Sequence, residues 1–578
     1  MPKDKTKSYL TIILVLFTAV YIIHNLIAVK QGNQINCLET RMQASILRYY
    51  SIQSHPDSWW KEINNPFSPK PEDRGIYELI SLPVYLVFGV SAQSAIYTNF
   101  IFLLLLVFSV YKIGSIVQDR YLGALAVFML LMYPAIFGFT RIYFTPLAST
   151  AIVSFAIYCL LSSGHFKNTR KVILLTIAVI MLSRIKIEKG LVYLFFPAAL
   201  YLIESFKVNR RDLSSVSRIY RNFCIFSILS IVFSTVSIGA FNFIHRVKYY
   251  LSEVCGVTGN LRVSPHVPLT DTAFIYLKDL YFIQIGELGF IFFILGVIFF
   301  LKGKFRHKAI ISSWIIFPYL FHSAYYYYSG IHASYYTLEY IPAFALISSY
   351  GIYRLIRAVP VALGVIICAS FITLNLVNYA LINYYNKQLP LLRPTKPVSF
   401  IGKLYLCSPR ATGEECFATA QALIEKIIAK KKKASVIFIN HYPLLLTVKD
   451  KLSLYNVIKK NRVYIYDFSD LVFNLELPDS AETLSLRLKG ADLIISGNRF
   501  YPALSSTILE KFRQFGSVYD FRHQVHIEEE EFSRIADNFE LVREIKDPQI
   551  RVSFFINNKL SGLIKKDAED GSLTIKLK

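Results

Sequence analysis

Acidic side chains cluster in one polar stretch near the N-terminus, between the first apolar segment and the next. These are Glu39, Asp57, Glu72 and Asp73. A carboxylate in such a loop can accept the proton of an attacking hydroxyl group and act as a general base. Glu39 is our first candidate for this catalytic role. Asp57 is the second, because a long loop can fold it toward the same place.

Several basic side chains follow later apolar segments on the predicted outer side. They are Arg141, Arg184, Lys186, Lys189 and His332. Among the first 385 residues, most other Lys and Arg residues lie in the loops of the opposite side. An ionisable residue at a membrane boundary is costly unless it is paired or solvated, so each is a functional candidate. Each could instead extend its charged end to the interface. Together they would suit the binding of a departing phosphate on a lipid carrier.

Apolar segments that could cross a bilayer recur through the first 385 residues. Of 578 residues 54% are hydrophobic, and the mean hydropathy is +0.42, too high for a soluble protein of this size. A spanning helix needs about 20 apolar residues, and we predict about eleven such helices here. The apolar runs are Tyr9–Ala28, Thr98–Val110, Leu122–Phe139, Leu147–Leu161, Val172–Leu182, Leu191–Ile203, Phe226–Ala240, Phe290–Leu301, Ala309–Leu320, Ile341–Ile352 and Val361–Val377.

The net charge of +24 would be typical of a nucleic-acid-binding protein, but its placement argues against such a partner. The Lys and Arg clusters fall in alternate short connections: Lys3–Lys7, Lys167–Lys171, Lys207–Arg221, Lys302–Lys308 and Arg354–Arg357. Short loops rich in these residues mark the cytoplasmic face. We therefore predict a multi-pass protein with a cytoplasmic N-terminus. An odd number of spans places the C-terminal part outside.

Two outer loops have a distinctive composition. The first, residues 30–75, is long and contains the amphipathic pattern Leu38–Tyr50, and the stretch Ile76–Phe88 that follows is too short to span. We expect Ile76–Phe88 to be a re-entrant or horizontal helix. The later loop His322–Tyr340 is crowded with tyrosine. An aromatic belt explains most of these side chains, but Tyr335 and Tyr336 are candidates to line a substrate site.

Residues 386–578 have a different pattern, in which short β-branched runs alternate with helical ones. This predicts an extracytoplasmic α/β domain with a mostly parallel sheet. The predicted strands are Ser435–Asn440, Val463–Phe468, Ala491–Ser496 and Ser517–Phe521, with Val552–Ile556 and Leu573–Leu577 as edge strands. The domain lacks the glycine-rich motifs that bind nucleotides. We expect it to have an accessory or acceptor-docking role.

Cysteine and acid spacing predict no metal site. Cys407 and Cys416 flank a short loop and fit either a disulfide in an oxidising compartment or two separate thiols. No CxxC pair occurs, which excludes a zinc ribbon of that type. The scattered acids of the first loop do not have the spacing of a ligand set. No cofactor is predicted, and a divalent cation is left open.

Five stretches in order carry a resemblance to a known family. They are Cys37-Leu38-Glu39-Thr40, Lys70-Pro71 through Tyr85, Ser91–Gly114, Met132-Tyr133-Pro134 with Thr140-Arg141-Ile142-Tyr143, and Tyr336–Leu346. The last is similar to an RYxLPxxP pattern. By these stretches the first 380 residues resemble the polytopic GT-C glycosyltransferases, the group that includes protein O-mannosyltransferases and bacterial aminoarabinose transferases.

The resemblance implies an inverting hexosyl- or pentosyltransferase at the outer face of the plasma membrane. Such an enzyme would take a sugar from a polyprenyl-phosphate donor and pass it to a hydroxyl on a lipid, glycan or protein. Glu39 would match the first-loop catalytic acid, and Arg184 the basic residue that meets the donor phosphate. His332 falls where the family often has lysine. Besides donor and acceptor, the expected partners are membrane lipids.

This chain departs from the family pattern at four positions. Tyr335 replaces an arginine, Glu339 replaces a proline, Pro146 falls where many relatives have an acid, and Glu39 is single rather than paired. The alternative is a membrane transporter or a lipid-handling or scaffold protein without catalytic activity. Transporters often have duplicated halves, which the sequence lacks. The missing arginine at Tyr335 favours the scaffold.

Overall fold

The computed structural model describes most of the helical part of the chain and selected elements of the rest. It covers residues 3–30, 76–185, 187–238, 269–303, 305–329 and 334–385. It also covers a few positions between 45 and 53, a helical stretch within 420–431, and five strands beyond it. The chain divides into two compact units. Met1–Ile35 and Arg48–Ser408 form the first, and Asn36–Leu47 and Pro409–Lys578 the second.

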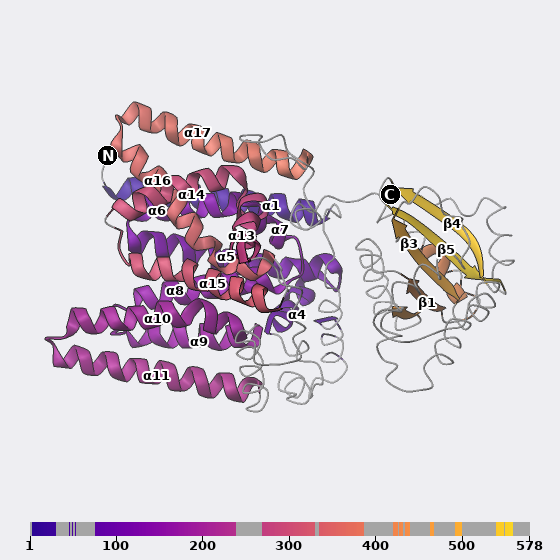
Figure 1. Cartoon of the computed structure of the whole chain (residues 1–578), viewed down its shortest axis with the longest axis horizontal. Helices are drawn as coiled ribbons and strands as arrows, with labels where there is room; N and C mark the ends of the chain where they lie inside the picture. Colours follow the sequence, from indigo (N-terminus) through magenta and orange to yellow (C-terminus); the bar gives the residue numbers. More distant parts are fainter. Residues whose placement is uncertain are drawn as a thin grey trace. The chain divides into compact units, whose positions relative to one another are not determined.

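The first unit is a bundle of helices that run mostly along one direction (Figure 1). Its longer helices are α1 (Lys3–Lys30), α5 (Ala92–Val117), α6 (Arg120–Met132), α8 (Thr145–Ser162), α9 (Thr169–Ile185), α10 (Ile187–Asn209), α11 (Leu213–Ile238), α14 (Gly286–Lys302), α15 (Lys308–Ser329), α16 (Ile341–Ala358) and α17 (Val361–Ala380). Its shorter ones are α4 (Ile76–Phe88), α7 (Pro134–Thr140), α13 (Leu269–Asp279), η3 (Leu280–Gln284), η4 (Ser334–Tyr340) and η5 (Leu381–Tyr385).

Helix length and composition confirm a polytopic helical membrane protein. In the part of the chain that the structure describes, four helices are long and apolar enough to span a membrane by themselves, or up to six if each bent pair counts as one span. The four are Tyr9–Lys30, Gln93–Val117, Thr145–Ser162 and Val361–Asn383. The total of about eleven stays a prediction. The short stretch Ile76–Phe88 is helical with the predicted bounds.

One predicted run is not a continuous helix. The apolar run Leu122–Phe139 is broken at Tyr133, where α6 ends and α7 turns away by 67°, and the pair passes as one bent span. The cause is Pro134, which has no backbone N–H and disfavours helical geometry in the residue before it. Tyr133 accordingly has an extended ψ of 131°. The break matters because α7 leads directly to Arg141.

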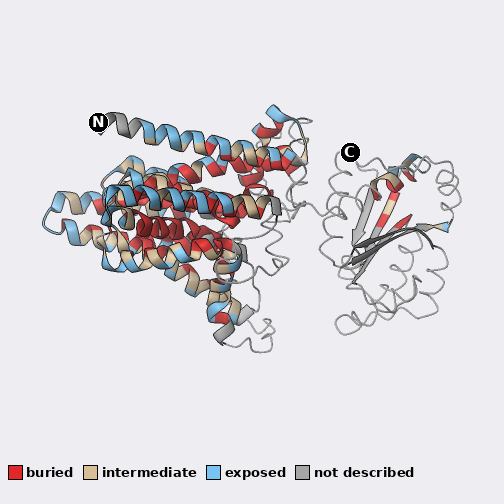
Figure 2. Cartoon of the chain, turned by 90° about the horizontal axis from the view of Figure 1, so that it is seen from above, coloured by how far each residue is buried: buried red, intermediate tan, exposed pale blue. Residues whose placement is uncertain are grey.

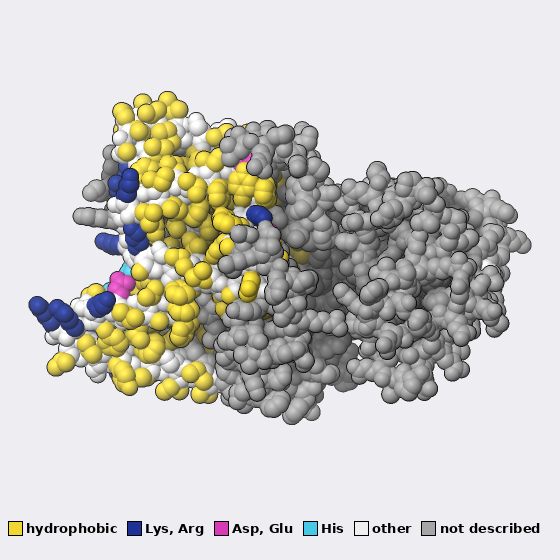
Figure 3. All heavy atoms as spheres, in the orientation of Figure 1, with side chains coloured by type: hydrophobic (Ala, Val, Ile, Leu, Met, Phe, Trp, Pro, Cys, Tyr) yellow, Lys and Arg dark blue, Asp and Glu magenta, His cyan; other side chains and the backbone are white. Residues whose placement is uncertain are grey.

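Burial and charge orient the bundle. α8 and α16 are buried along most of their length, whereas α1, at the N-terminus in Figure 2, is mostly exposed. On the face that Figure 3 draws, hydrophobic side chains cover the described part of the bundle, and most of the visible Lys and Arg side chains gather at one end, on the left. The turn between α10 and α11 lies at that end. This distribution matches the cytoplasmic clusters that the sequence predicts.

Two glycines allow α14 and α16 to cross closely. A Cβ atom on Gly296 would lie 2.2 Å from the carbonyl oxygen of Ile347, and one on Gly351 would lie 2.7 Å from Gly296 Cα. Because both obstacles are backbone atoms, a larger side chain cannot be accommodated by a rotamer change. Glycine at these positions therefore sets the distance between the two helices.

We expect Gly296→Leu to destabilise the protein by about 1–3 kcal/mol or more, because it forces two buried helices apart. The measurement is thermal unfolding in detergent micelles. Ile294→Ala on the same helix is the control, since Ile294 is 46% exposed and its truncation should change stability little. Equal effects of the two substitutions would contradict the close crossing.

The second unit contains a five-stranded sheet with the order β2-β1-β3-β5-β4. The strands are β1 (Ala434–Ile439), β2 (Val463–Asp467), β3 (Leu493–Arg499), β4 (Phe539–Asp547) and β5 (Ile550–Asn557). β1 pairs in parallel with both β2 and β3, whereas β5 pairs antiparallel with β3 and β4.

The sheet confirms some predicted strands and corrects others. The first three predicted strands correspond to β1, β2 and β3, and Val552–Ile556 lies within β5. The prediction of a mostly parallel sheet is wrong, because β4 and β5 form an antiparallel hairpin and β5 is internal. Two residues separate these strands, a connection too short for a parallel crossover. Ser517–Phe521 and Leu573–Leu577 lie outside the described residues.

Candidate functional site

The structure describes some of the predicted site residues. Glu39, Asp57, Lys186 and His332 lie outside the described part of the chain. Tyr335 belongs to η4, and Tyr336, Arg184 and Arg141 are described with their side chains. The candidate site is therefore built from these last three residues and the elements that hold them.

Arg141 follows α7 directly and is 3% exposed. Its Nε donates a hydrogen bond of 2.7 Å to Asn25 Oδ1 on α1, and its guanidinium lies 5.7 Å from the centre of the Phe137 ring. Its Nη2 has no hydrogen-bond partner among the residues that the structure describes. A buried cation is destabilising unless other groups offset its charge. Arg141 is therefore a candidate for binding an anion.

Asn99 on α5 holds the segment that carries Arg141. Its buried Nδ2 donates to the carbonyl oxygens of Phe139, Thr140 and Ile142, at 3.1, 3.2 and 2.6 Å. Its Oδ1 accepts a hydrogen bond of 2.7 Å from the Tyr77 hydroxyl on α4. Phe139 and Thr140 end α7, where the last carbonyl groups have no partner within the helix, and Ile142 follows shortly after. Asn99 thus couples α4, α5 and the turn before Arg141.

We expect Asn99→Leu to destabilise the protein strongly, because each buried polar group left unsatisfied costs about 1–3 kcal/mol. Thermal unfolding of the purified protein measures the effect. Tyr77→Phe is the matched control, since it removes only one bond to Asn99 and should cost about 1 kcal/mol. A smaller effect for Asn99→Leu than for Tyr77→Phe would contradict this role.

Helices α1 and α17 meet beside Arg141. His24 Nδ1 and the Tyr379 hydroxyl are hydrogen-bonded at 2.7 Å, and Asn25 Nδ2 lies 3.5 Å from the same hydroxyl oxygen. Asn25 Nδ2 also donates to the Tyr21 carbonyl at 2.8 Å. We did not predict these residues from the sequence. The available signal was a His–Asn pair inside an otherwise apolar first span, which is costly in a membrane.

Helix η4 is held by its neighbours through hydrogen bonds to Tyr336, Thr337 and Glu339. The Tyr193 hydroxyl of α10 donates to the Tyr336 carbonyl at 2.7 Å, and Gln284 Nε2 donates to Thr337 Oγ1 at 2.8 Å. Ser149 Oγ of α8 donates to Glu339 Oε1 at 2.5 Å. Trp314 Nε1 of α15 donates to the Glu339 carbonyl at 2.9 Å.

Glu339 therefore has a structural explanation for its departure from the family pattern. Its side chain is fully buried and anchors η4 to α8. The Tyr336 ring, in turn, stacks on His322 with a centroid distance of 5.8 Å and lies 6.2 Å from the Tyr325 ring. The role of Tyr335 and Tyr336 in lining a substrate site stays a prediction.

Arg184 and Arg141 lie at the same end of the bundle. Arg184 is half-buried in the last turn of α9, and Arg141 stands just before α8. α8 and α9 are neighbouring helices of 18 and 17 residues, joined by the basic turn that follows Ser162. Since the two helices run in opposite directions, the start of α8 and the end of α9 are both remote from that turn. This placement agrees with the predicted outer face.

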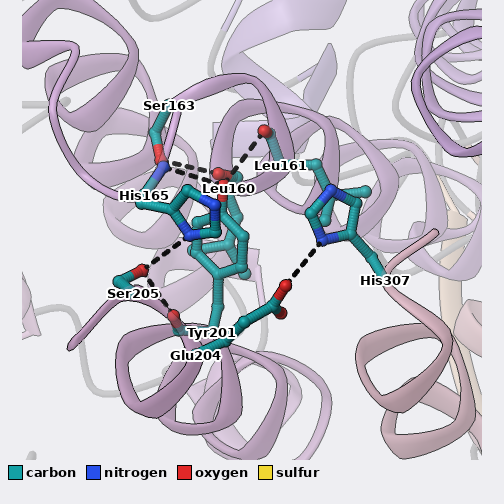
Figure 4. Close-up of polar contacts among 8 residues, drawn as sticks. All are labelled: Leu160, Leu161, Ser163, His165, Tyr201, Glu204, Ser205 and His307. Carbon is teal, nitrogen blue, oxygen red and sulfur yellow. Dashed lines mark hydrogen bonds and ion pairs between the residues drawn. The ribbon is translucent and has the colours of Figure 1, made fainter. Parts of the chain in front are cut away.

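A second polar cluster lies at the basic end (Figure 4). The His165 ring stacks on Tyr201 at 5.2 Å, and its Nδ1 is hydrogen-bonded to Ser205 Oγ at 3.3 Å. His307 Nδ1 lies 3.6 Å from Glu204 Oε1. No group of His, Cys, Asp and Glu side chains in the described ranges could hold a metal ion. His165 precedes α9 and His307 precedes α15, and both contact side chains of α10. The cluster therefore attaches these two turns to α10.

This cluster should make stability depend on pH. Burial lowers the pKa of His165, as do His307 and Lys167, although Glu204 acts in the opposite direction. The unfolded chain therefore binds a proton first, and the folded state loses stability as pH falls below about 6.5. Thermal unfolding between pH 5 and pH 8 measures this loss. We expect a smaller loss in His165→Gln, and an unchanged profile would contradict the assignment.

Comparison with known proteins supports the fold. No family model matches the chain, and no curated protein does. Among solved structures, the chain is similar to ArnT from Cupriavidus metallidurans bound to undecaprenyl phosphate. The identity is 12%, the TM-score is 0.50, and the match covers 93% of this chain and 97% of that one.

Two further structures are similar at lower scores. The apo state of the same ArnT matches at 13% identity over 94% of this chain and 98% of that one, with a TM-score of 0.49. Archaeal oligosaccharyltransferase AglB from Archaeoglobus fulgidus, in complex with an inhibitory peptide and a dolichol-phosphate, matches at 11% identity. That match covers 83% of this chain and 69% of that one, with a TM-score of 0.42. The similarity to the first structure shows that this chain has an ArnT-like fold of the GT-C type.

Proposed function

We propose that this chain is a membrane glycosyltransferase that moves a hexose or pentose from a polyprenyl-phosphate carrier to a hydroxyl group, with inversion. The reaction takes place at the outer face of the plasma membrane, the N-terminus being cytoplasmic. Residues 1–385 form the catalytic part. Residues 386–578 form an outer domain that docks the acceptor, which is a lipid, a glycan or a protein.

The observation that carries this proposal is the buried guanidinium of Arg141. Arginine stays protonated in proteins, so this side chain carries its charge even where water is excluded. Its planar donors match the geometry of phosphate oxygens, and its Nη2 has no partner among the described residues. Further support comes from the similarity in fold to ArnT, whose structure contains undecaprenyl phosphate.

The proposed reaction divides the work between an acid-base group and several cations. Glu39, with Asp57 as the second candidate, accepts the proton of the acceptor hydroxyl. The hydroxyl oxygen then bonds to the anomeric carbon, and the bond from that carbon to the phosphate oxygen breaks. The outer cations stabilise the negative charge on the departing phosphate. These cations are Arg141, Arg184, Lys186 and His332.

The bilayer contributes to catalysis by holding the prenyl chain of the donor. This fixes the anomeric carbon near the membrane surface and reduces the entropy lost when donor and acceptor align.

The test is incubation of the purified protein with a radiolabelled polyprenyl-phosphate sugar, with Glu39→Gln as the control. We expect the native protein to consume the donor and the variant to lose activity. Turnover that survives in Glu39→Gln would overturn the catalytic assignment but keep the enzyme class. Failure of the native protein to bind any of a panel of such donors would favour a transporter or a scaffold.

A further inference from the structure

Helices α10 and α11 extend past the helices beside them at the basic end of the bundle (Figure 1). The turn between α8 and α9 is hydrogen-bonded to both of them. Asn222 Nδ2 of α11 donates to the Phe166 carbonyl at 2.6 Å. The His165 amide donates to the Tyr201 hydroxyl of α10 at 3.0 Å. Since α11 begins at Leu213, at a rise of about 1.5 Å per residue it reaches about 13 Å beyond that turn.

This extension is longer than the headgroup layer of a bilayer is thick. Helices α8 and α9 have 18 and 17 residues. Each is therefore about 26 Å long, close to the hydrocarbon core of about 30 Å, and their connecting turn lies at the edge of that core. The headgroup layer on each side is about 5–8 Å thick. The turn between α10 and α11 thus stands beyond the headgroups, in water.

Three cations around this turn are exposed and have no side-chain partner among the described residues. They are Lys207, Arg210 and Arg211. Dark blue side chains stand at the far left of Figure 3, where this turn lies. The neighbouring carboxylate of Asp212 accepts hydrogen bonds from Ser215 N and Oγ, at 3.2 and 2.5 Å, and caps the start of α11. The turn therefore presents positive charge that no described side chain pairs.

Other cations at the basic end are engaged by their own surroundings. Arg357 lies 3.5 Å from Asp119 Oδ2 and 4.5 Å from the centre of the Tyr353 ring. Lys308 Nζ donates to the Leu301 carbonyl at 2.7 Å. Orientation in the membrane explains basic residues at this end in general. It does not explain why the cations of the α10–α11 turn are left for a partner outside the described chain.

Two aliphatic side chains flank the same turn. Val208 near the end of α10 is 63% exposed, and Leu213 at the start of α11 is 83% exposed. The Asp212 amide donates to the Asn209 carbonyl at 2.9 Å, which closes the turn and brings the two helix ends together. Burial of these side chains against a partner would remove apolar surface from water. We call Lys207, Val208, Arg210, Arg211 and Leu213 the hairpin tip.

We infer that the hairpin tip docks an acidic segment of a soluble protein, on the side of the membrane that the sequence predicts to be cytoplasmic. Carboxylates of such a segment complement the three cations, and an aliphatic side chain among them would cover Val208 and Leu213. The tip is small, so the contact belongs with the weak, transient interfaces that bury less than about 1,200 Å². The inference does not depend on the proposed reaction, which takes place at the opposite end of the bundle.

The first experiment measures whether lipid reaches the hairpin tip. The full chain is placed in nanodiscs that contain phosphatidylglycerol and a phospholipid with a nitroxide near the top of its acyl chain. Tryptophan fluorescence is compared with that of the native chain. Tyr220→Trp is the reference, because Tyr220 is 64% exposed on the same helix, about 10 Å nearer the membrane. We expect the nitroxide to quench Tyr220→Trp and not Leu213→Trp. Equal quenching of the two would assign the tip to lipid and overturn the inference.

The second experiment determines what the hairpin tip binds. A library of short random peptides is selected on the native protein in nanodiscs, after depletion on the double variant Arg210→Gln/Arg211→Gln. We expect the selected peptides to be rich in Asp and Glu around an aliphatic residue. A synthetic copy should bind the native protein about tenfold more tightly than the double variant. Its affinity should fall as salt is added, because salt screens exposed charges.

Two further variants separate this contact from general attraction to positive charge. Arg357→Gln removes a cation that already has a partner, and it should change the affinity for the selected peptide less than about twofold. Leu213→Ser removes the apolar contact and should weaken the peptide about tenfold. Neither position is buried, so thermal unfolding should stay unchanged. Selection of neutral or basic peptides, or an affinity that the double variant leaves unchanged, is incompatible with the inference.

Discussion

Replacement of Arg141 by methionine is expected to abolish sugar transfer while leaving the protein about as stable as the native chain. Loss of a preorganised group that stabilises developing charge typically costs about 10²–10³-fold in rate. Removal of a buried charge that has no counterion among the described residues is favourable by several kcal/mol. Against this, Asn25 Oδ1 loses its donor from Arg141, which costs about 1–3 kcal/mol. The two terms roughly offset each other.

Donor turnover and thermal unfolding in the same detergent measure these two effects. Arg141→Lys is the conservative control, since it keeps the charge but not the paired donors, and we expect it to retain part of the activity. A structural role for Arg141 predicts the opposite pattern. In that case Arg141→Met would unfold at a clearly lower temperature, and its residual activity would follow the folded fraction.

Replacement of Glu39 by glutamine is expected to reduce transfer by about 10²–10⁴-fold, the usual contribution of a general base. Glutamine has nearly the same shape, but its amide cannot accept the proton of the acceptor hydroxyl. Donor binding should therefore persist, so the effect should fall on kcat rather than on KM for the donor. Steady-state kinetics with labelled donor make this measurement.

Three further substitutions in the first loop complete this experiment. Asp57→Asn tests the second candidate, and Glu72→Gln serves as a matched control because it alters a carboxylate to which we assign no role. If Asp57→Asn abolishes turnover and Glu39→Gln does not, the base is Asp57. If Glu72→Gln is as damaging as Glu39→Gln, the loop contributes general charge rather than one base. Asp73→Asn would then show the same loss.

The sequence predicted the membrane class and most helices correctly, because these depend on local composition. Runs such as Val361–Val377 have to be helical and apolar wherever they cross a bilayer, since no water can satisfy their backbone groups. The Lys- and Arg-rich loops between helices could likewise be assigned to one end of the bundle, because they occur in alternate loops along the sequence. Pro134 in the sequence also indicated a helix break at Tyr133. The sequence did not show that the short helix after this break ends at a buried Arg141.

The surroundings of Arg141 could not be predicted in the same way. Asn25 on α1 bonds to Arg141 and lies beside Tyr379 of α17, and Asn99 of α5 bonds to the carbonyl of Ile142. Nothing in the local sequence of these helices states that they meet there. From the sequence, Glu339 was only a departure from the family pattern. In the structure its carboxylate accepts a buried hydrogen bond from Ser149. In the second unit, β4 has alternating charges and was not predicted, because its pairing with β5 lies beyond the reach of local pattern.

By itself, the order of apolar and basic residues determined that this is a polytopic membrane protein and which end of each helix is basic. The cause is the hydrocarbon core, which acts on every segment separately. Only the tertiary structure decided that Arg141 is buried and held by Asn25, and that its Nη2 has no partner among the residues described. That result depends on helices distant in sequence packing side by side, and packing follows from complementary shape over the whole bundle.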